Sequence, residues 1–351
     1  MASKGVFIFG YMYCGTSLLQ RILSRHPSIY AERKELKFLQ SIARIKQVYP
    51  DISTPSKKRE YIAFCTFAIK NALKVSSDLS KIPLEAYIEQ SRHIQSDSND
   101  HFGIYFDTYE QLAGNHQYWL DGSPNNVFYH AEIRRLRPEA KFIIIVRDVR
   151  DVLASKKKRR DTTTLERYDE QVLTLKKLEK GYSCVADSLS WKSTYALCNT
   201  VSSNDSNTLL IRYEDLTQEP ERTVKKLCEF LEIEYMSHLL NTRFSNSADP
   251  SRRSSGIFAN SGNYRRHLKS GEVYVAQSIT KKLLTTFEYP LERVSFFSRI
   301  QSIIPWLKFF PQLIGRLWNR YKLLGFWNFI SFMKLNTRKL TRGIIKSSPA
   351  H

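Results

Sequence analysis

A short apolar run near the start of the chain, residues 6–9, leads into a loop with glycines at positions 10 and 15 and then into apolar residues at helical spacing. The β-branched and aromatic residues predict a buried strand, and the spacing after the loop predicts a helix. In such a unit the glycines let the backbone approach an anion, which the helix N-terminus can hold. The pattern is typical of a phosphate-binding loop, although an ordinary strand-turn-helix unit gives the same pattern.

Gly10 and Gly15 have the spacing of a P-loop, G-x-x-x-x-G-K-[ST], but Thr16 stands where that motif has lysine. The lysine reaches the outer phosphates of a nucleoside triphosphate, so its absence argues against transfer or hydrolysis of a γ-phosphate. Thr16 and Ser17 still add hydroxyl donors to the loop. We therefore expect a relative of the P-loop enzymes, with a kinase-like nucleotide enzyme as the less favoured alternative.

Further apolar runs predict strands at residues 118–121, 141–146 and 208–212, with helical patterns between them. The middle run has five consecutive apolar residues, as in a central strand covered on both faces. Arg147 follows it and should lie in the crevice where open α/β sheets bind ligands, and Ser155 comes eight residues later on the next helix. The alternation predicts an α/β fold with a mainly parallel central sheet flanked by helices.

The segments between these runs are less regular. Residues 39–117 are predicted to be mainly helical, another helix is expected at about 126–136, and the Ser-, Asn-, Arg- and Gly-rich stretch 245–263 predicts a mobile loop. Two charged stretches, 32–37 and 156–160, each have two interpretations. They are either solvated surface or parts of a site, the second as a rim that attracts an acidic substrate.

Length and composition favour a folded protein that works in a reducing compartment. The 351 residues suffice for one large α/β domain, predicted at 1–292, and an extension at 293–351. The five cysteines are scattered without a C-x-x-C pair, which fits neither a disulfide framework nor a zinc site. No signal-peptide pattern and no apolar run of about 18 residues is present. We expect a cytoplasmic protein, or one peripheral to a membrane, without a bound metal.

Positive charge is concentrated in the predicted extension. The chain has a net charge of +20, and residues 293–351 contain 11 Lys or Arg but no Asp or Glu. Aromatic and aliphatic residues alternate with these cations, a pattern that favours contact with an anionic membrane surface. The alternative is a terminal helical hairpin that packs its aromatics on the main domain. Specific nucleic-acid binding is not expected, because no nucleic-acid-binding fold is recognisable and the aromatics are too apolar for base stacking.

Taken together, these motifs resemble the sulfotransferase family, whose members move a sulfuryl group from 3′-phosphoadenosine 5′-phosphosulfate (PAPS) to a hydroxyl or amine. The resemblance runs from about residue 5 to 290 and implies a P-loop NTPase-like sulfotransferase fold with a C-terminal helical extension. It also implies PAPS as donor, 3′-phosphoadenosine 5′-phosphate (PAP) as product, and no metal. The donor-binding residues implied are Gly10, Cys14, Gly15, Thr16 and Ser17 for the 5′-phosphosulfate, Arg147 and Ser155 for the 3′-phosphate, and Arg265 and Arg266 of a later landmark.

The general base is implied by a second, local resemblance. Lys34-Glu35-Leu36-x-Phe38 is similar to a Lys-Glu-x-His-Phe-Phe segment of the glycan-directed branch, where the glutamate takes the acceptor proton. Glu35 is therefore the candidate base, with Glu32 as the alternative. The acceptor, whether glycan, lipid, small alcohol or protein tyrosine, is not assigned by these motifs.

Two positions depart from the family pattern. The family usually has Arg or Lys two residues before the second loop glycine, where this chain has Tyr13, and a lysine common before the Ser/Thr-Pro pair is replaced by Gly122. Tyr13 can donate only a neutral hydrogen bond, about half as strong as a charge-assisted one. Lys34, Lys37 or Arg265 could supply the missing charge. The chain is thus expected to be an active sulfotransferase, or else a catalytically impaired, membrane-associated binding protein of the same fold.

Overall fold

The computed structural model describes residues 3–32, 35–71, 82–162, 181–241, 243–245, 253–255, 257, 261–315 and 317–318. Its centre is a five-stranded sheet in the order β2-β3-β1-β4-β5, in which all neighbours run parallel. The strands are β1 (Lys4–Phe9), β2 (Ile29–Ala31), β3 (Tyr118–Asp121), β4 (Lys141–Val146) and β5 (Thr208–Arg212). The parallel α/β sheet predicted from the sequence is confirmed, and the strands share one carboxyl edge.

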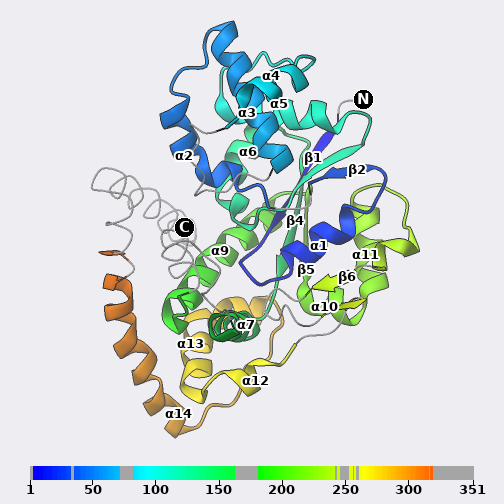
Figure 1. Ribbon diagram of the computed structural model, residues 1–351. Helices are drawn as coiled ribbons and strands as arrows, with labels where there is room; N and C mark the ends of the chain where they lie inside the picture. Colours follow the sequence, from blue (N-terminus) through cyan, green and yellow to red (C-terminus); the bar gives the residue numbers. More distant parts are fainter. Residues whose placement is uncertain are drawn as a thin grey trace, which may run out of the picture.

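Apolar residues cover both faces of the sheet, which explains why β1 from Val6 and β4 from Phe142 are apolar without interruption. Side chains of β1 alternate between the two faces. Phe7 and Phe9 belong to one core cluster, and Val6 and Ile8 belong to the cluster on the other face. The first face is covered mainly by α2 (Phe38–Val48), α3 (Pro55–Asn71), α5 (His101–Ala113), α9 (Cys184–Asn204) and α13 (Ser270–Thr286). The second is covered by α1 (Thr16–Leu23) and α11 (Pro220–Phe230) (Figure 1).

The remaining elements connect these layers. They are α4 (Leu84–Gln90), η2 (Pro124–Tyr129), α6 (His130–Leu136), α7 (Val149–Thr162), α10 (Tyr213–Gln218), η3 (Ser237–Leu240), α12 (Tyr264–His267) and α14 (Phe296–Gln301). The helix expected at 126–136 begins as a 3₁₀ turn, with Pro124 in its first turn. The predicted loop at 245–263 was wrong in part, because β7 (Arg253–Ser255) pairs antiparallel with β6 (Arg243–Ser245).

Helix α13 contacts both α14, near the C-terminal end, and α7, the helix that follows β4. Glu272 accepts a hydrogen bond from Lys157 of α7 at 2.7 Å, and the neighbouring Gly271 lies against α14, where an added Cβ would come within 2.6 Å of the Gln301 carbonyl carbon. The chain is helical again at 303–315, after a turn at Ser302, so the predicted C-terminal helical extension is present. Among the helices described, none is both long and apolar enough to cross a lipid bilayer.

Candidate functional site

The glycine loop connects β1 to α1 at the carboxyl edge of the sheet, and both glycines are required there. Gly15 has φ 98°, and a Cβ on it would come within 2.5 Å of Cδ2 of Tyr213. A Cβ on Gly10 would lie 3.0 Å from the carbonyl oxygen of Ile145 in the neighbouring strand. The loop is therefore pressed between β4 and the start of α10, with no room for side chains at these two positions.

Helix α1 begins at Thr16 with the features of an anion-binding terminus. No described side chain caps its first turn, which also contains no acidic residue. Thr16 is buried and Ser17 is exposed, so their hydroxyls face different surroundings. The Leu18 N–H donates to the Gly15 carbonyl at 3.0 Å, so the N–H groups of Thr16 and Ser17 and the positive end of the helix dipole are the ones that face a negatively charged group at the loop.

Tyr13 and Cys14 fix the shape of the loop. Tyr13 has φ 65°, in the left-handed region, and its side chain is half-buried. Cys14 is fully buried, and burial raises the pKa of its thiol to about 12 although a hydrogen bond with Tyr195 opposes the shift. The Cys14 N–H donates to the Tyr11 carbonyl at 3.2 Å. Cys14 is therefore a neutral packing residue in this structure, and its assignment to donor binding stays a prediction.

Arg147, at the end of β4, joins the glycine loop to α7. Its Nη1 donates to the carbonyl oxygen of Tyr13 at 2.9 Å and to Oγ of Ser155 at 3.3 Å. The guanidinium lies over the Tyr213 ring, 4.3 Å from its centroid. Arg147 is buried there, with only 4% of its surface exposed. Trp191 Nε1 donates to the Arg147 carbonyl at 3.1 Å and so holds its backbone. The structure thus brings together the two segments that the sequence predicted as separate phosphate sites.

Asp151 positions the later landmark segment. Its carboxylate accepts hydrogen bonds from the N–H groups of Gly262, at 2.7 Å, and Tyr264, at 3.0 Å, which fixes α12 beside α7. Arg265 and Arg266 lie on α12 and are exposed. Arg265 donates through Nη2 to Oε1 of Glu292 at 2.6 Å. The segment therefore lies next to the helix of Ser155, but the Arg265 side chain is engaged by a carboxylate.

The charged loop after β2 is tied to the end of β3. The Lys37 N–H donates to Oγ of Ser123 at 3.0 Å, and the Ser123 N–H donates to Oδ1 of Asp121 at 2.9 Å. Glu35 lies two residues earlier and is half-buried, whereas Lys34 falls outside the described residues. The alternative base, Glu32, accepts a hydrogen bond from the Tyr30 hydroxyl at 2.9 Å. The candidate base thus belongs to a loop anchored beside the glycine loop.

We did not predict from the sequence three buried residues that support the loops of the site. Asp121 is fully buried, burial raises its pKa, and it holds Ser123. The Tyr195 hydroxyl donates to the Ile145 carbonyl at 2.7 Å and accepts from the Tyr11 N–H at 3.1 Å, so it links β4 to the glycine loop. Tyr213 forms the wall against Gly15. The polar residues at the ends of β3 and β5 were visible signals for Asp121 and Tyr213, but nothing local marked Tyr195.

Comparison with known proteins gives one family match. A sequence model described as the sulfotransferase family matches residues 5–237. A search of curated proteins found no match.

A search of solved structures matched the following three sulfotransferases, among others. The sulfotransferase domain from the curacin biosynthetic pathway is 18% identical, with 83% of this chain and 99% of that chain covered and a TM-score of 0.48. The sulfotransferase domain of the Synechococcus PCC 7002 olefin synthase is 17% identical, with 83% and 97% covered and a TM-score of 0.49. A mouse sulfotransferase complexed with PAP is 14% identical, with 86% and 89% covered and a TM-score of 0.39.

Proposed function

Since the chain belongs to the sulfotransferase family, we propose that it transfers a sulfuryl group from PAPS to a hydroxyl or amine of an acceptor. The observation that carries the donor assignment is the position of Arg147. This buried guanidinium contacts both the Tyr13 carbonyl of the glycine loop and the Ser155 hydroxyl. A donor with phosphate at each end requires two neighbouring anion sites, and a guanidinium between them is a strong phosphate ligand.

The residues present fit such a donor. Gly10 and Gly15 carry no side chain that could shield the loop backbone, and Gly15, the N-cap of α1, offers no side-chain cap to its first turn. We assign the 5′-phosphosulfate to the N–H groups and hydroxyls of Thr16 and Ser17. The 3′-phosphate is assigned to Arg147 and Ser155, with Arg266 at the rim.

The proposed reaction is an in-line displacement at sulfur. The acceptor oxygen or nitrogen forms a bond to sulfur while the bond from sulfur to the bridging phosphate oxygen breaks, and its electron pair leaves with PAP. Glu35 takes the acceptor proton, which requires its carboxylate to come within about 3 Å of that group. Positioning of the two reactants and donors at the leaving phosphate supply most of the acceleration.

A specific observation supports a second candidate, a family member that binds the nucleotide but transfers slowly or not at all. Tyr13 is uncharged where the family usually has a cation, and Arg265 is paired with Glu292. Tyr13→Arg separates the two candidates when transfer from labelled PAPS is measured. If the wild type already transfers and Tyr13→Arg raises the rate, the protein is an enzyme. If the wild type binds PAP but only Tyr13→Arg transfers, the protein is the impaired form.

Calorimetric titration with PAP tests the donor site. We expect wild-type binding to weaken about 10- to 100-fold in Arg147→Ala, because hydrogen bonds to charged groups contribute about 1.5–3 kcal/mol. Ser155→Ala removes one hydroxyl and should weaken binding by a smaller factor without loss of the fold. The matched control is Arg222→Ala, since Arg222 is exposed and remote from the loop in sequence. Absence of wild-type binding, or equal binding by Arg147→Ala, contradicts the assignment.

A further inference from the structure

Helix α14 buries a serine and exposes its large apolar side chains. Ser298 and Ser302 are 5% and 7% exposed, whereas Phe296 and Phe297 are 76% and 67% exposed. The serines face the protein because α14 approaches α13 closely at Gly271, where only a hydrogen fits. A helix of a globular protein normally has the opposite arrangement, with its apolar stripe in the core.

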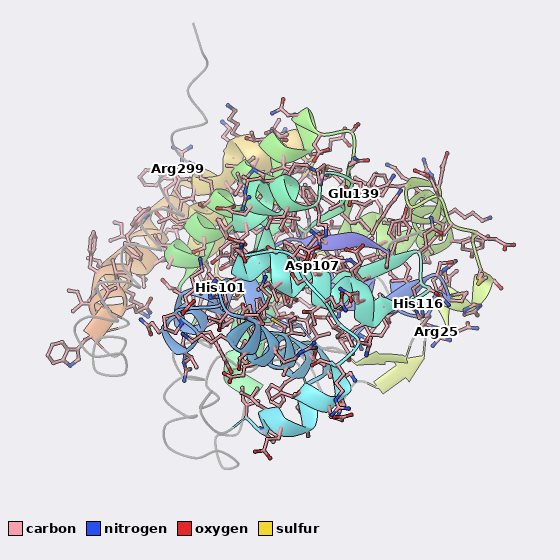
Figure 2. All side chains as sticks on the ribbon, turned by 90° about the horizontal axis from the view of Figure 1, so that it is seen from above. Arg25, His101, Asp107, His116, Glu139 and Arg299 are labelled. Atoms are coloured by element: carbon pink, nitrogen blue, oxygen red, sulfur yellow. The ribbon has the colours of Figure 1, made fainter. Side chains whose placement is uncertain are left out.

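The exposed apolar surface continues along the helical residues 303–315. Large side chains recur at intervals of three or four residues, a spacing that keeps them on one side of a helix. We call this set the apolar stripe; it comprises Phe296 (76% exposed), Ile300 (48%), Ile303 (54%), Leu307 (69%), Phe310 (63%) and Ile314 (66%). In both views this part of the chain, coloured orange, runs along the outer edge of the molecule (Figures 1 and 2).

Cations flank the apolar stripe, and no anions accompany them. Arg299, labelled on the helix in Figure 2, and Lys308 are exposed. From position 293 to the end, the sequence contains 11 Lys or Arg and no Asp or Glu. Exposed apolar side chains with an excess of positive charge are complementary to a surface that is apolar inside and anionic outside.

We propose that residues 296–315 dock this protein onto an anionic lipid membrane. The apolar stripe enters the boundary between headgroups and acyl chains, and Arg299 and Lys308 contact lipid phosphates. The segment lies in the plane of the interface, because no helix among the described residues can cross a bilayer. The inference is independent of the sulfuryl-transfer activity.

Charge disfavours the other occupants of this surface. A second copy of the chain would bring a segment with the same positive charge and no acidic residue, so like charges would repel. A nucleic acid would be held by dense cations and aromatic stacking, whereas the apolar stripe is mostly aliphatic. Both alternatives are separate outcomes of the test.

Co-sedimentation of the full chain with lipid vesicles tests the proposal. We expect binding to vesicles of phosphatidylcholine with phosphatidylserine, weaker binding to phosphatidylcholine alone, and a decrease at high salt. The variant Leu307→Asp, Phe310→Asp, Ile314→Asp should bind acidic vesicles at least about tenfold more weakly, because it removes buried apolar area and adds repelled charge. Its thermal unfolding should be unchanged, since all three side chains are exposed.

The matched control places the same three charges on exposed apolar residues outside the segment, Val48→Asp with Leu189→Asp and Leu291→Asp, which are 44%, 39% and 40% exposed. This control should bind vesicles like the wild type. The proposal is overturned if the wild type does not sediment with acidic vesicles, or if the triple variant and the control bind equally. Two further results, each in the absence of vesicle binding, also overturn it. One is a dimer in sedimentation velocity that the triple variant loses, and the other is binding of a duplex DNA.

Discussion

The glycine-loop region and the C-terminal helical segment differ in which kind of side chain they bury. Around the loop, charged groups are buried: Arg147, Arg150 and Asp151 are 4%, 0% and 2% exposed. In α14 the large apolar side chains Phe296, Phe297 and Ile300 are exposed and Ser298 is buried. Each arrangement carries a solvation penalty, but the first is offset by hydrogen bonds within the chain, whereas the second can be offset only by something outside it. Perturbing the two regions should therefore affect different properties.

Removal of a buried charge should give the largest loss of stability. Arg150 is paired with Asp148 at 2.6 Å, and its Nη1 donates to Oε1 of Gln277 at 2.6 Å. Arg150→Ala leaves the Asp148 carboxylate buried without this partner, so the free energy of unfolding in urea should fall by about 3–5 kcal/mol. Arg222→Ala, which breaks an exposed pair with Glu219, should cause no measurable change. A small effect at Arg150 would mean that water replaces the lost partner.

A methyl group in the glycine loop should have the next largest effect. Gly15→Ala must keep a positive φ and also place a Cβ 2.5 Å from Tyr213, whereas Gly114, with φ 58°, has no atom within 4 Å of an added Cβ. Gly114→Ala, at φ 58° and ψ −123°, should cost about 1–3 kcal/mol of backbone strain alone, whereas Gly15→Ala adds about 1–3 kcal/mol of overpacking to the strain of its αL backbone. Chemical denaturation of both variants measures the difference. Equal losses would show that Tyr213 moves away without cost.

A pH series on Glu214 should give a smaller, graded effect. Burial raises the pKa of Glu214, and the hydrogen bonds from the Tyr289 hydroxyl and the Asp148 N–H only partly oppose this. Above the unfolded pKa of about 4.3, the folded state therefore holds the proton more tightly than the unfolded state, and stability falls as the pH rises through the folded pKa.

Glu214→Gln cannot titrate. The free energy of unfolding of the wild type minus that of Glu214→Gln should thus decrease as the pH rises from about 4 through the folded pKa, by about 1.4 kcal/mol for each unit of pKa difference. Urea unfolding at several pH values measures it. Parallel pH profiles for the two proteins would contradict the raised pKa.

Substitutions in α14 should have the smallest effect on stability. Phe296→Ser and Ile300→Ser change exposed side chains, so the free energy of unfolding should stay within about 0.5 kcal/mol of the wild type. Leu284→Ala, at a fully buried position of α13, should instead cost about 2–5 kcal/mol. Thermal unfolding of the three variants makes the comparison. A large loss from Phe296→Ser would mean that the side chain is covered within the protein.

The sequence predicted the centre of the fold well because local pattern and tertiary surroundings agree there. Five consecutive apolar residues at 142–146 correctly indicated a strand with two covered faces. The short β2 was missed, since its three residues gain strand structure only by pairing with β3, Ile29 opposite Tyr118. For the same reason, β7 could not be recognised within a Ser- and Arg-rich stretch that is typical of a loop.

The candidate site was predictable where spacing alone determines geometry. A strand end followed by a helix brings Arg147 and Ser155 together, and the hydrogen bond between them is present. The direction of Arg265 was not predictable, because it depends on Asp151 holding a loop 111 residues away and on Glu292 lying nearby. The roles of Glu35 and Arg266, and of Lys34 outside the described residues, stay predictions.

Helix α13 gives the two contrasted regions a common rigid support. One residue of its first turn, Glu272, pairs with Lys157 of α7, and the residue before it, Gly271, lies against α14. The distance between the carboxyl edge of the sheet and the apolar stripe is then set by one helix rather than by a linker. On a lipid surface, such a protein would hold the carboxyl edge of its sheet at a fixed height and tilt above the membrane.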